Sequence, residues 1–169
     1  YGQYPFSKRG WAAWNDWYRN GVKGQDPYHA PGFIFGKFLP NNSIDTMKKY
    51  ILGTTIAQDG IYLQSSHSVN YLASHDNYTL GDFIGIFMQT HDPGNPEKSV
   101  KLDARQLAIH KLAALFLMVS QGPPMIHAGQ EFGRSKIIAP TSIPNTRVGH
   151  LDENSYNKDD ETNWMNYDH

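Results

Sequence analysis

At residues 69–80 the chain has the sequence VNYLASHDNYTL, in which a short apolar stretch ends in three adjacent polar side chains. The apolar residues alternate with other residues, and their aromatic and β-branched character favours a strand. His75, Asp76 and Asn77 would then lie at the carboxyl end of this strand. In an α/β barrel that end of each strand carries the active site. The stretch therefore predicts a strand that presents catalytic or binding groups.

Helical patterns lie on both sides of this strand. Residues 43–52 predict a helix that begins at a good N-cap, Ser43. Residues 79–88 also predict a helix, because their apolar side chains recur at helical spacing. The longest predicted helix covers about residues 103–120 and leads into a short apolar strand at residues 124–128. Strand, long helix and strand form a βαβ unit, whose two strands are parallel. Both strands then end on one face, which would bring the polar triplet beside residues 129–131.

The two ends of the chain have fewer regular patterns. Aromatic, glycine and proline residues predict a loop over residues 1–10, and residues 11–22 predict a short amphipathic helix with an alternative start at Asn15. Prolines and glycines in residues 24–42 predict a long loop. A polar composition with further prolines predicts loops over residues 137–169.

Composition excludes several classes of protein. Fifteen basic and sixteen acidic residues give a net charge of −1, so the chain lacks the positive charge that nucleic acid or an anionic membrane would attract. There is no cysteine for a disulfide and no apolar run long enough to span a bilayer. The sequence predicts a soluble protein and does not distinguish a secreted from a cytoplasmic one. Its 13% aromatic residues suit either ordinary packing or stacking on sugar rings.

Four segments resemble a known family in their order along the chain. The stretch at residues 69–80 resembles the last short signature of the α-amylase superfamily, the clan of retaining α-glucan hydrolases and transglycosidases. SQGPPMIHAGQEF, at residues 120–132, is similar to the eighth-strand segment of that family. NSYNKDDETNW, at residues 154–164, looks like the following loop in pullulanases, isoamylases and glycogen-debranching enzymes. WNDWYRN, at residues 14–20, is similar to the segment after the sixth strand in debranching members.

The resemblance implies an α/β fold, namely the C-terminal portion of a (β/α)8 TIM barrel from about the region of strand six to strand eight. A complete barrel takes about 250 residues, with about 200 as a lower bound, and this chain has 169. The family's nucleophile and general acid/base belong to strands four and five, and no matching segment precedes Trp14. We expect one partial barrel domain with a loop-rich first segment and short helix (1–42), a segment of helix, strand seven, long helix and strand eight (43–136), and loops (137–169).

The resemblance also implies roles for individual residues. Asp76 matches the family's third carboxylate, which accepts hydrogen bonds from ring hydroxyls and stabilises the oxocarbenium-like transition state. It is neither of the two carboxyl groups, about 5 to 5.5 Å apart, that a retaining mechanism uses as nucleophile and acid. His75 would donate to a hydroxyl of the same sugar, and Asn77 would orient the loop or contact substrate. Tyr156 and Asn157 would form a wall facing an α-glucan oligosaccharide or polysaccharide.

Other interpretations of these residues stay open. A His-Asp-Asn triplet often caps a loop, and Tyr156 and Asn157 would also suit simple loop packing. Glu131 is a second carboxylate, but its family counterpart belongs to the structural end of strand eight. The eight histidines form no zinc motif, and His127 and Glu131 lie on either side of a glycine. We expect no cofactor; calcium occurs in many family members, but no ligand for it can be assigned.

Two classes of function follow. The first is a glycoside hydrolase of α-glucan metabolism, most like an α-1,6 debranching enzyme, with the remainder of the barrel in the same or another chain. The second is a noncatalytic carbohydrate-binding or structural fragment. In both cases we expect the 169-residue chain to be inactive alone. Because strands cut from a closed barrel leave an open edge and uncovered helix faces, we also expect it to associate or aggregate in isolation.

Overall fold

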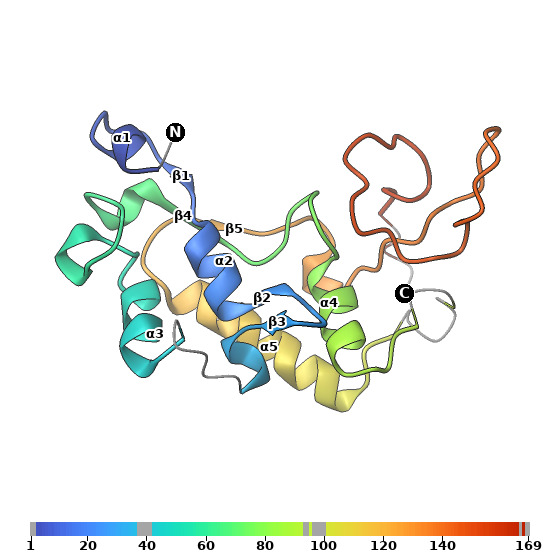
Figure 1. Ribbon diagram of the computed structural model, residues 1–169, viewed down its shortest axis with the longest axis horizontal. Helices are drawn as coiled ribbons and strands as arrows, with labels where there is room; N and C mark the ends of the chain where they lie inside the picture. The colour runs from blue at the N-terminus through green and yellow to red at the C-terminus, as the bar shows by residue number, and fades with distance from the viewer. Residues whose placement is uncertain (1–2, 37–41, 93–94, 96–100, 166, 168–169) are drawn as a thin grey trace. The chain divides into compact units, whose positions relative to one another are not determined.

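In the computed structural model, which describes residues 3–36, 42–92, 95, 101–165 and 167, the chain divides into two units. Unit 1 comprises Tyr1–Leu72 and Lys111–Ile126, and unit 2 comprises Ala73–His110 and His127–His169. Figure 1 labels the helices and strands of both. The predicted strand thus belongs to unit 1, and the polar triplet that follows it belongs to unit 2.

Unit 1 contains a three-stranded parallel sheet in the order β1-β4-β5. Its strands, side by side in Figure 1, are β1 (Ala13–Trp14), β4 (Ser68–Tyr71) and β5 (Pro124–Met125). Tyr71 of β4 lies opposite Met125 of β5. The parallel pairing confirms the predicted βαβ unit, although the strand predicted over residues 124–128 ends at Met125.

Asn15 connects this sheet to helix α2 (Asp16–Val22). Its side-chain Oδ1 accepts a hydrogen bond from the Tyr18 amide at 3.0 Å and so caps the helix. Its Nδ2 lies 2.8 Å from Thr54 Oγ1 and 2.9 Å from Ser68 Oγ, and Asn15 is fully buried. The helix start at Asn15 is therefore confirmed. The earlier start is wrong, because the two preceding residues pair with β4 as strand β1.

Helix α3 (Ile44–Ile51) begins where the sequence predicts. Ser43 Oγ accepts a hydrogen bond from the Thr46 amide at 3.2 Å, which is the geometry of an N-cap. Two short 3-10 helices, η2 (Ile56–Gln58) and η3 (Ser65–His67), then lead into β4.

Two segments predicted as loops contain regular structure. They hold helix α1 (Gln3–Ser7), the antiparallel strands β2 (Gly24–Asp26) and β3 (Ala30–Pro31), and the 3-10 helix η1 (Phe33–Phe35). A Cβ on Gly24 would lie 2.4 Å from the Ala30 carbonyl oxygen, and Gly24 has a φ of +112°. The glycines that indicated a loop therefore permit a tight ribbon instead. Residues 37–41 of the predicted loop lie outside the described residues.

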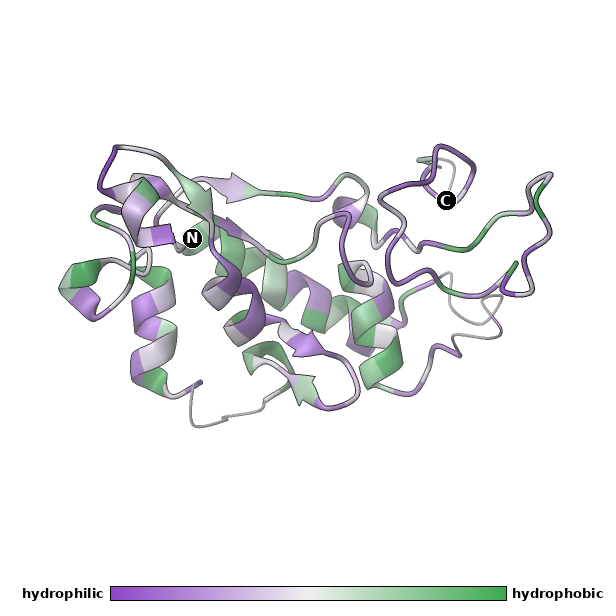
Figure 2. Cartoon of the chain, turned by 45° about the horizontal axis from the view of Figure 1, so that its top comes forward, coloured by the Kyte–Doolittle hydropathy of each residue, from purple (hydrophilic) through white to green (hydrophobic). Residues whose placement is uncertain are grey.

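Unit 2 is built on helix α4 (Leu80–Phe87), the first residues of α5 (Ala104–Val119) and the 3-10 helix η5 (Gln130–Phe132). Thr79 caps α4, since its Oγ1 accepts a hydrogen bond from the Asp82 amide at 3.1 Å. The hydrophobic residues of α4, coloured green in Figure 2, are mostly buried. Both helices occupy the ranges that the sequence predicts.

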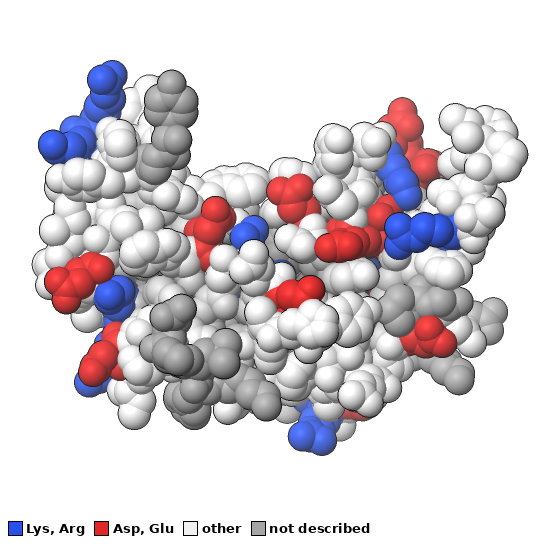
Figure 3. Space-filling view, in the orientation of Figure 1, with Lys and Arg blue, Asp and Glu red and all other residues white. Residues whose placement is uncertain are grey.

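Loops make up the described part of unit 2 after η5, as predicted for residues 137–169. An isolated β-bridge joins Ile137 to Leu151. Basic and acidic side chains are interspersed over the face drawn in Figure 3. None of the helices in the described part of the chain is long and apolar enough to cross a membrane.

Candidate functional site

The polar triplet lies in a loop of unit 2, residues 73–79, which we call the Asp76 loop. The side chains of His75 and Asp76 are 52% and 47% exposed, and His75 Nε2 lies 3.3 Å from Asp76 Oδ1. The loop thus presents a carboxylate and an imidazole together to solvent. Such a pair offers both acceptors and a donor to the hydroxyl groups of a ligand.

Asn77 gives this loop its sharp change of direction. Its φ is +63°, in the left-handed region that asparagine tolerates better than most residues. The residue directly after Asp76 therefore has a backbone conformation that the surrounding structure must maintain.

Tyr156 comes from a distant part of the sequence to the same loop. Its ring centroid lies 6.5 Å from that of His75, with the planes inclined at 62°. The tyrosine is exposed, and Asn157 beside it in the chain is also exposed. Of the predicted site residues, the structure therefore brings Tyr156 beside His75 of the triplet. Asn157 directly follows Tyr156 in the chain.

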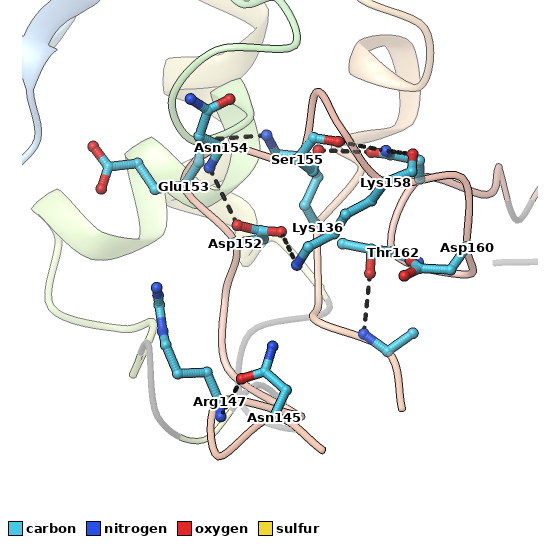
Figure 4. Close-up of polar contacts among 12 residues, drawn as sticks. Lys136, Asn145, Arg147, Asp152, Glu153, Asn154, Ser155, Lys158, Asp160 and Thr162 are labelled. Carbon is cyan, nitrogen blue, oxygen red and sulfur yellow. Dashed lines mark hydrogen bonds and ion pairs between the residues drawn. The ribbon is translucent and has the colours of Figure 1, made fainter. Parts of the chain in front are cut away.

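Hydrogen bonds among its neighbours hold the segment that carries Tyr156, and Figure 4 shows several of these contacts. Asp152 accepts hydrogen bonds from Lys158 Nζ at 2.6 Å and from the Asn154 amide at 3.2 Å. Ser155 Oγ donates to Asn163 Oδ1 at 2.6 Å. The residues on both sides of Tyr156 are therefore fixed while its ring projects outward.

Lys136 is a buried residue of this site that sequence reasoning missed. The residue is fully buried, and its Nζ donates to the carbonyl oxygens of His75 at 3.2 Å, Asn77 at 2.9 Å and Glu153 at 3.3 Å. Burial lowers the pKa of this ammonium to about 8, and the nearby carboxylates of Asp152 and Asp82 oppose that shift. A lysine directly before the apolar residues 137–139 does not by itself indicate these contacts.

Asp82, in the first turn of α4, is a second buried ionisable group. Its Oδ2 accepts a hydrogen bond from the Lys136 amide at 3.0 Å, and its Oδ1 accepts one from Ser135 Oγ at 2.5 Å. Burial raises the pKa of this carboxyl to about 6, although both hydrogen bonds work against the rise. Its acidic side chain therefore joins α4 to the segment that carries Lys136.

The chemistry available to the Asp76 loop is limited by its single carboxylate. Retaining glycoside hydrolysis needs a nucleophile and an acid about 5 to 5.5 Å apart, and Asp76 is the only acidic residue between 73 and 79. Glu131 lies exposed in η5, and its placement beside the polar triplet stays a prediction. Within the described residues, no three His, Asp or Glu side chains gather as a metal site.

Comparisons with known proteins identify the relationship. No model of a known protein family matches this sequence. The pullulanase of Bacillus subtilis strain 168, however, is 32% identical over 91% of this chain and 18% of its own length. This chain is related to the debranching enzymes of the α-amylase superfamily.

Two further relatives support that statement. The glycogen operon protein GlgX homolog of Mycobacterium tuberculosis H37Rv is 26% identical over 93% of this chain and 21% of its own length. The solved structure of a mutant pullulanase from Paenibacillus barengoltzii, complexed with maltotetraose, matches with a TM-score of 0.67 and 30% identity over 92% of this chain and 21% of that chain. The family resemblance and the α/β character of the matched region are thereby confirmed. The chain spans about a fifth of the length of these relatives.

Proposed function

We propose that this chain forms the C-terminal part of the (β/α)8 barrel of an α-glucan debranching hydrolase. In this proposal β4 and β5 are barrel strands seven and eight, and β1 belongs to the strand-six region. Residues 1–42, 43–136 and 137–169 are then successive segments of one partial barrel domain. The parallel order β1-β4-β5 and the similarity to pullulanases support this assignment.

One observation carries the functional part of the proposal, which is the exposed pair of His75 and Asp76 with the Tyr156 ring beside it. Asp76 accepts hydrogen bonds from ring hydroxyls and stabilises the positive charge that develops at the anomeric carbon and ring oxygen. His75 donates to a hydroxyl of the same sugar, and Asn77 turns the loop. Tyr156 and Asn157 form a wall against the α-glucan.

The two remaining carboxyl groups of a retaining mechanism come from the rest of the barrel. One carboxylate attacks the anomeric carbon while the other carboxylic acid protonates the departing glycosidic oxygen, and water then releases the glycosyl group with retention. An α-1,6 linkage is the preferred substrate in this proposal because the relatives include pullulanases.

Exposed apolar side chains mark where the rest of the barrel packs. On α5, within unit 1, Leu112, Leu115 and Met118 are exposed by 41%, 58% and 53%. A contiguous apolar face of this kind normally covers or is covered by another element. We call this chain together with the remainder of its barrel, in one polypeptide or two, the assembled enzyme.

The test compares the chain with the assembled enzyme on pullulan, a glucan with α-1,6 linkages. We expect the assembled enzyme to release reducing ends with retention of the anomeric configuration, followed by proton NMR at early times. We expect the purified 169-residue chain to give none. Turnover by the chain alone, or inversion by the assembled enzyme, would contradict the proposal; binding without turnover by the assembled enzyme would favour a noncatalytic carbohydrate-binding role.

A further inference from the structure

The Asp76 loop combines two properties that need an explanation. Its functional side chains are about half exposed, so packing against neighbours does little to orient them. The residue after Asp76 has a positive φ, so the backbone turns sharply directly beside the carboxylate. A catalytic carboxylate, however, must be held close to its productive geometry.

The buried ammonium of Lys136 supplies that support. Its Nζ bonds the carbonyl oxygens of His75 and Asn77, which are the residues on either side of Asp76. We propose that Lys136 is a positioning residue, which fixes both flanking carbonyls and thereby sets the direction of the Asp76 side chain. The inference rests on the role of Asp76 proposed above.

The third hydrogen bond of the ammonium extends this role to Tyr156. Lys136 Nζ also donates to the Glu153 carbonyl oxygen at 3.3 Å, three residues before Tyr156 in the chain. An ammonium carries three N–H donors around one point, so it can serve three converging carbonyls at once. One buried charge thus joins the two segments that carry the carboxylate and the aromatic wall.

The backbone of Lys136 is itself fixed. Its amide donates to Asp82 Oδ2 at 3.0 Å, and its carbonyl oxygen accepts from the Asp152 amide at 2.9 Å. Asp82 belongs to α4, whose capping residue Thr79 ends the Asp76 loop. The loop is therefore held at its centre by the Lys136 side chain and at its end by the helix to which the Lys136 backbone is bonded.

The competing explanation is that Lys136 only neutralises buried acidic groups. The charged groups that act on its ammonium are Asp152, Asp82, Arg134 and Asp76. A lysine with only this role would affect folding and leave the turnover number of the folded enzyme unchanged. The two explanations therefore differ in kcat.

The first experiment replaces Lys136 by methionine, which has similar length and no donor, in the assembled enzyme. Because a misplacement of about 1 Å can cost about 100-fold in rate, we expect kcat on pullulan to fall by about 10- to 100-fold. We expect KM to rise by a smaller factor than kcat falls, because the Glu153 hydrogen bond on the segment that carries Tyr156 is lost as well. Wild-type kcat in folded Lys136→Met would overturn the inference.

A matched control is Lys49→Met. Lys49 also donates to a backbone carbonyl, that of Asp59 at 3.1 Å, but it lies in α3 of unit 1. Its removal should leave kcat and KM at wild-type values. An equal loss of kcat in both variants would mean that the assay responds to any lost lysine contact, and it would overturn the specific role of Lys136.

A second variant covers the case in which Lys136→Met fails to fold. Lys136→Arg keeps the positive charge among the acidic groups, but a planar guanidinium cannot meet three carbonyls around one point. We expect a folded enzyme whose kcat is at least about fivefold below wild type. Wild-type kcat in Lys136→Arg would show that charge alone suffices and would overturn the positioning role.

The pH dependence gives a readout that a purely structural lysine would not change. With a pKa of about 8, Lys136 loses its third donor above that pH, and we expect the ratio of wild-type kcat to Lys136→Met kcat to decrease there. The folded-state pKa lies below the ordinary 10.5, so between the two values the unfolded chain binds more protons and this group makes stability rise with pH. Titration of Lys136 therefore does not itself destabilise the fold over this range, and circular dichroism at each pH checks that the enzyme stays folded.

Asp76→Asn, measured in parallel, separates the two proposals. Loss of kcat in Asp76→Asn without any loss in Lys136→Met would overturn the positioning role and leave the proposed function intact. Wild-type kcat in Asp76→Asn would overturn the proposed function of the loop itself.

Discussion

Each unit of this chain buries a polar cluster, and the two clusters differ in charge. In unit 1, Asn15, Thr54, Ser68 and Asn70 form a neutral network of side-chain hydrogen bonds at strand β4. In unit 2, the cluster contains two fully buried ionisable groups, the Lys136 ammonium and the Asp82 carboxyl, and the Lys136 backbone amide donates to Asp82. Burying neutral groups that are hydrogen-bonded costs little, whereas burying an ion costs several kcal/mol unless it is well paired.

The difference indicates what each cluster does. The neutral network links strand β4 to the residue that caps helix α2, so its loss should lower the free energy of unfolding. The Lys136 ammonium of the second cluster bonds the backbone of the Asp76 loop. In unit 2 this buried charge thus contacts a loop whose His75 and Asp76 side chains remain about half exposed to solvent.

The largest expected effect on stability comes from breaking the neutral network. Asn15→Ala removes an N-cap and the donors to Thr54 and Ser68, leaving buried acceptors unsatisfied. We expect the free energy of unfolding of the assembled enzyme to fall by about 2 to 4 kcal/mol, with kcat of the folded molecules unchanged. Urea unfolding followed by tryptophan fluorescence measures this.

Asn20→Ala is the control for that variant. Asn20 is only partly buried and accepts a hydrogen bond from the neighbouring Arg19, so its loss should cost less than about 0.5 kcal/mol. Equal destabilisation by the two variants would contradict the importance of the buried network.

An intermediate effect is expected from neutralising the charged cluster at Asp82. The folded-state pKa of about 6 exceeds the ordinary 3.8, so the folded state binds more protons between these values and wild-type stability from this group decreases as the pH rises from about 4 to 6. An asparagine at position 82 cannot titrate, so the stability of Asp82→Asn does not show this decrease. The stability of the variant relative to wild type should therefore increase by about 1 to 3 kcal/mol between pH 4 and 6.5.

Unfolding free energies at the two pH values, measured for both proteins, test this directly. A constant difference between Asp82→Asn and wild type would mean that Asp82 titrates in the folded state as it does in the unfolded one.

The smallest effect on stability is expected at the exposed edge of the site. Tyr156 is 68% exposed, so Tyr156→Ala should change the free energy of unfolding by less than about 0.5 kcal/mol. If Tyr156 packs against the glucan, KM for a branched substrate should rise about five- to tenfold with little change in kcat. Unchanged KM would assign this tyrosine to loop packing alone.

The comparison of the two clusters also explains which features the sequence could reveal. Ser43 and Thr79 act within one turn of their own helices, so local patterns predict α3 and α4. The sequence also predicts the Asp76 loop, because His75, Asp76 and Asn77 are contiguous in one motif. Strand β1, in contrast, consists of two residues that are extended only because they pair with β4.

Lys136 could not be predicted for a related reason. Its three acceptors come from residues 75, 77 and 153, and no local pattern records that they converge. In the sequence Asp82 is an ordinary acidic residue in the first turn of a helix, where its negative charge would interact favourably with the helix dipole. Only the tertiary structure shows that it is buried against the lysine segment.

The most direct test of the account is kcat of Asp76→Asn in the assembled enzyme. The substitution keeps the shape of the side chain and removes its charge, so folding should be nearly unaffected while the developing positive charge loses its stabiliser. We predict that kcat on pullulan falls by at least about 1000-fold, or about 4 kcal/mol of transition-state stabilisation, with a circular dichroism spectrum and melting temperature close to wild type. Near-normal kcat in the folded variant would contradict the account.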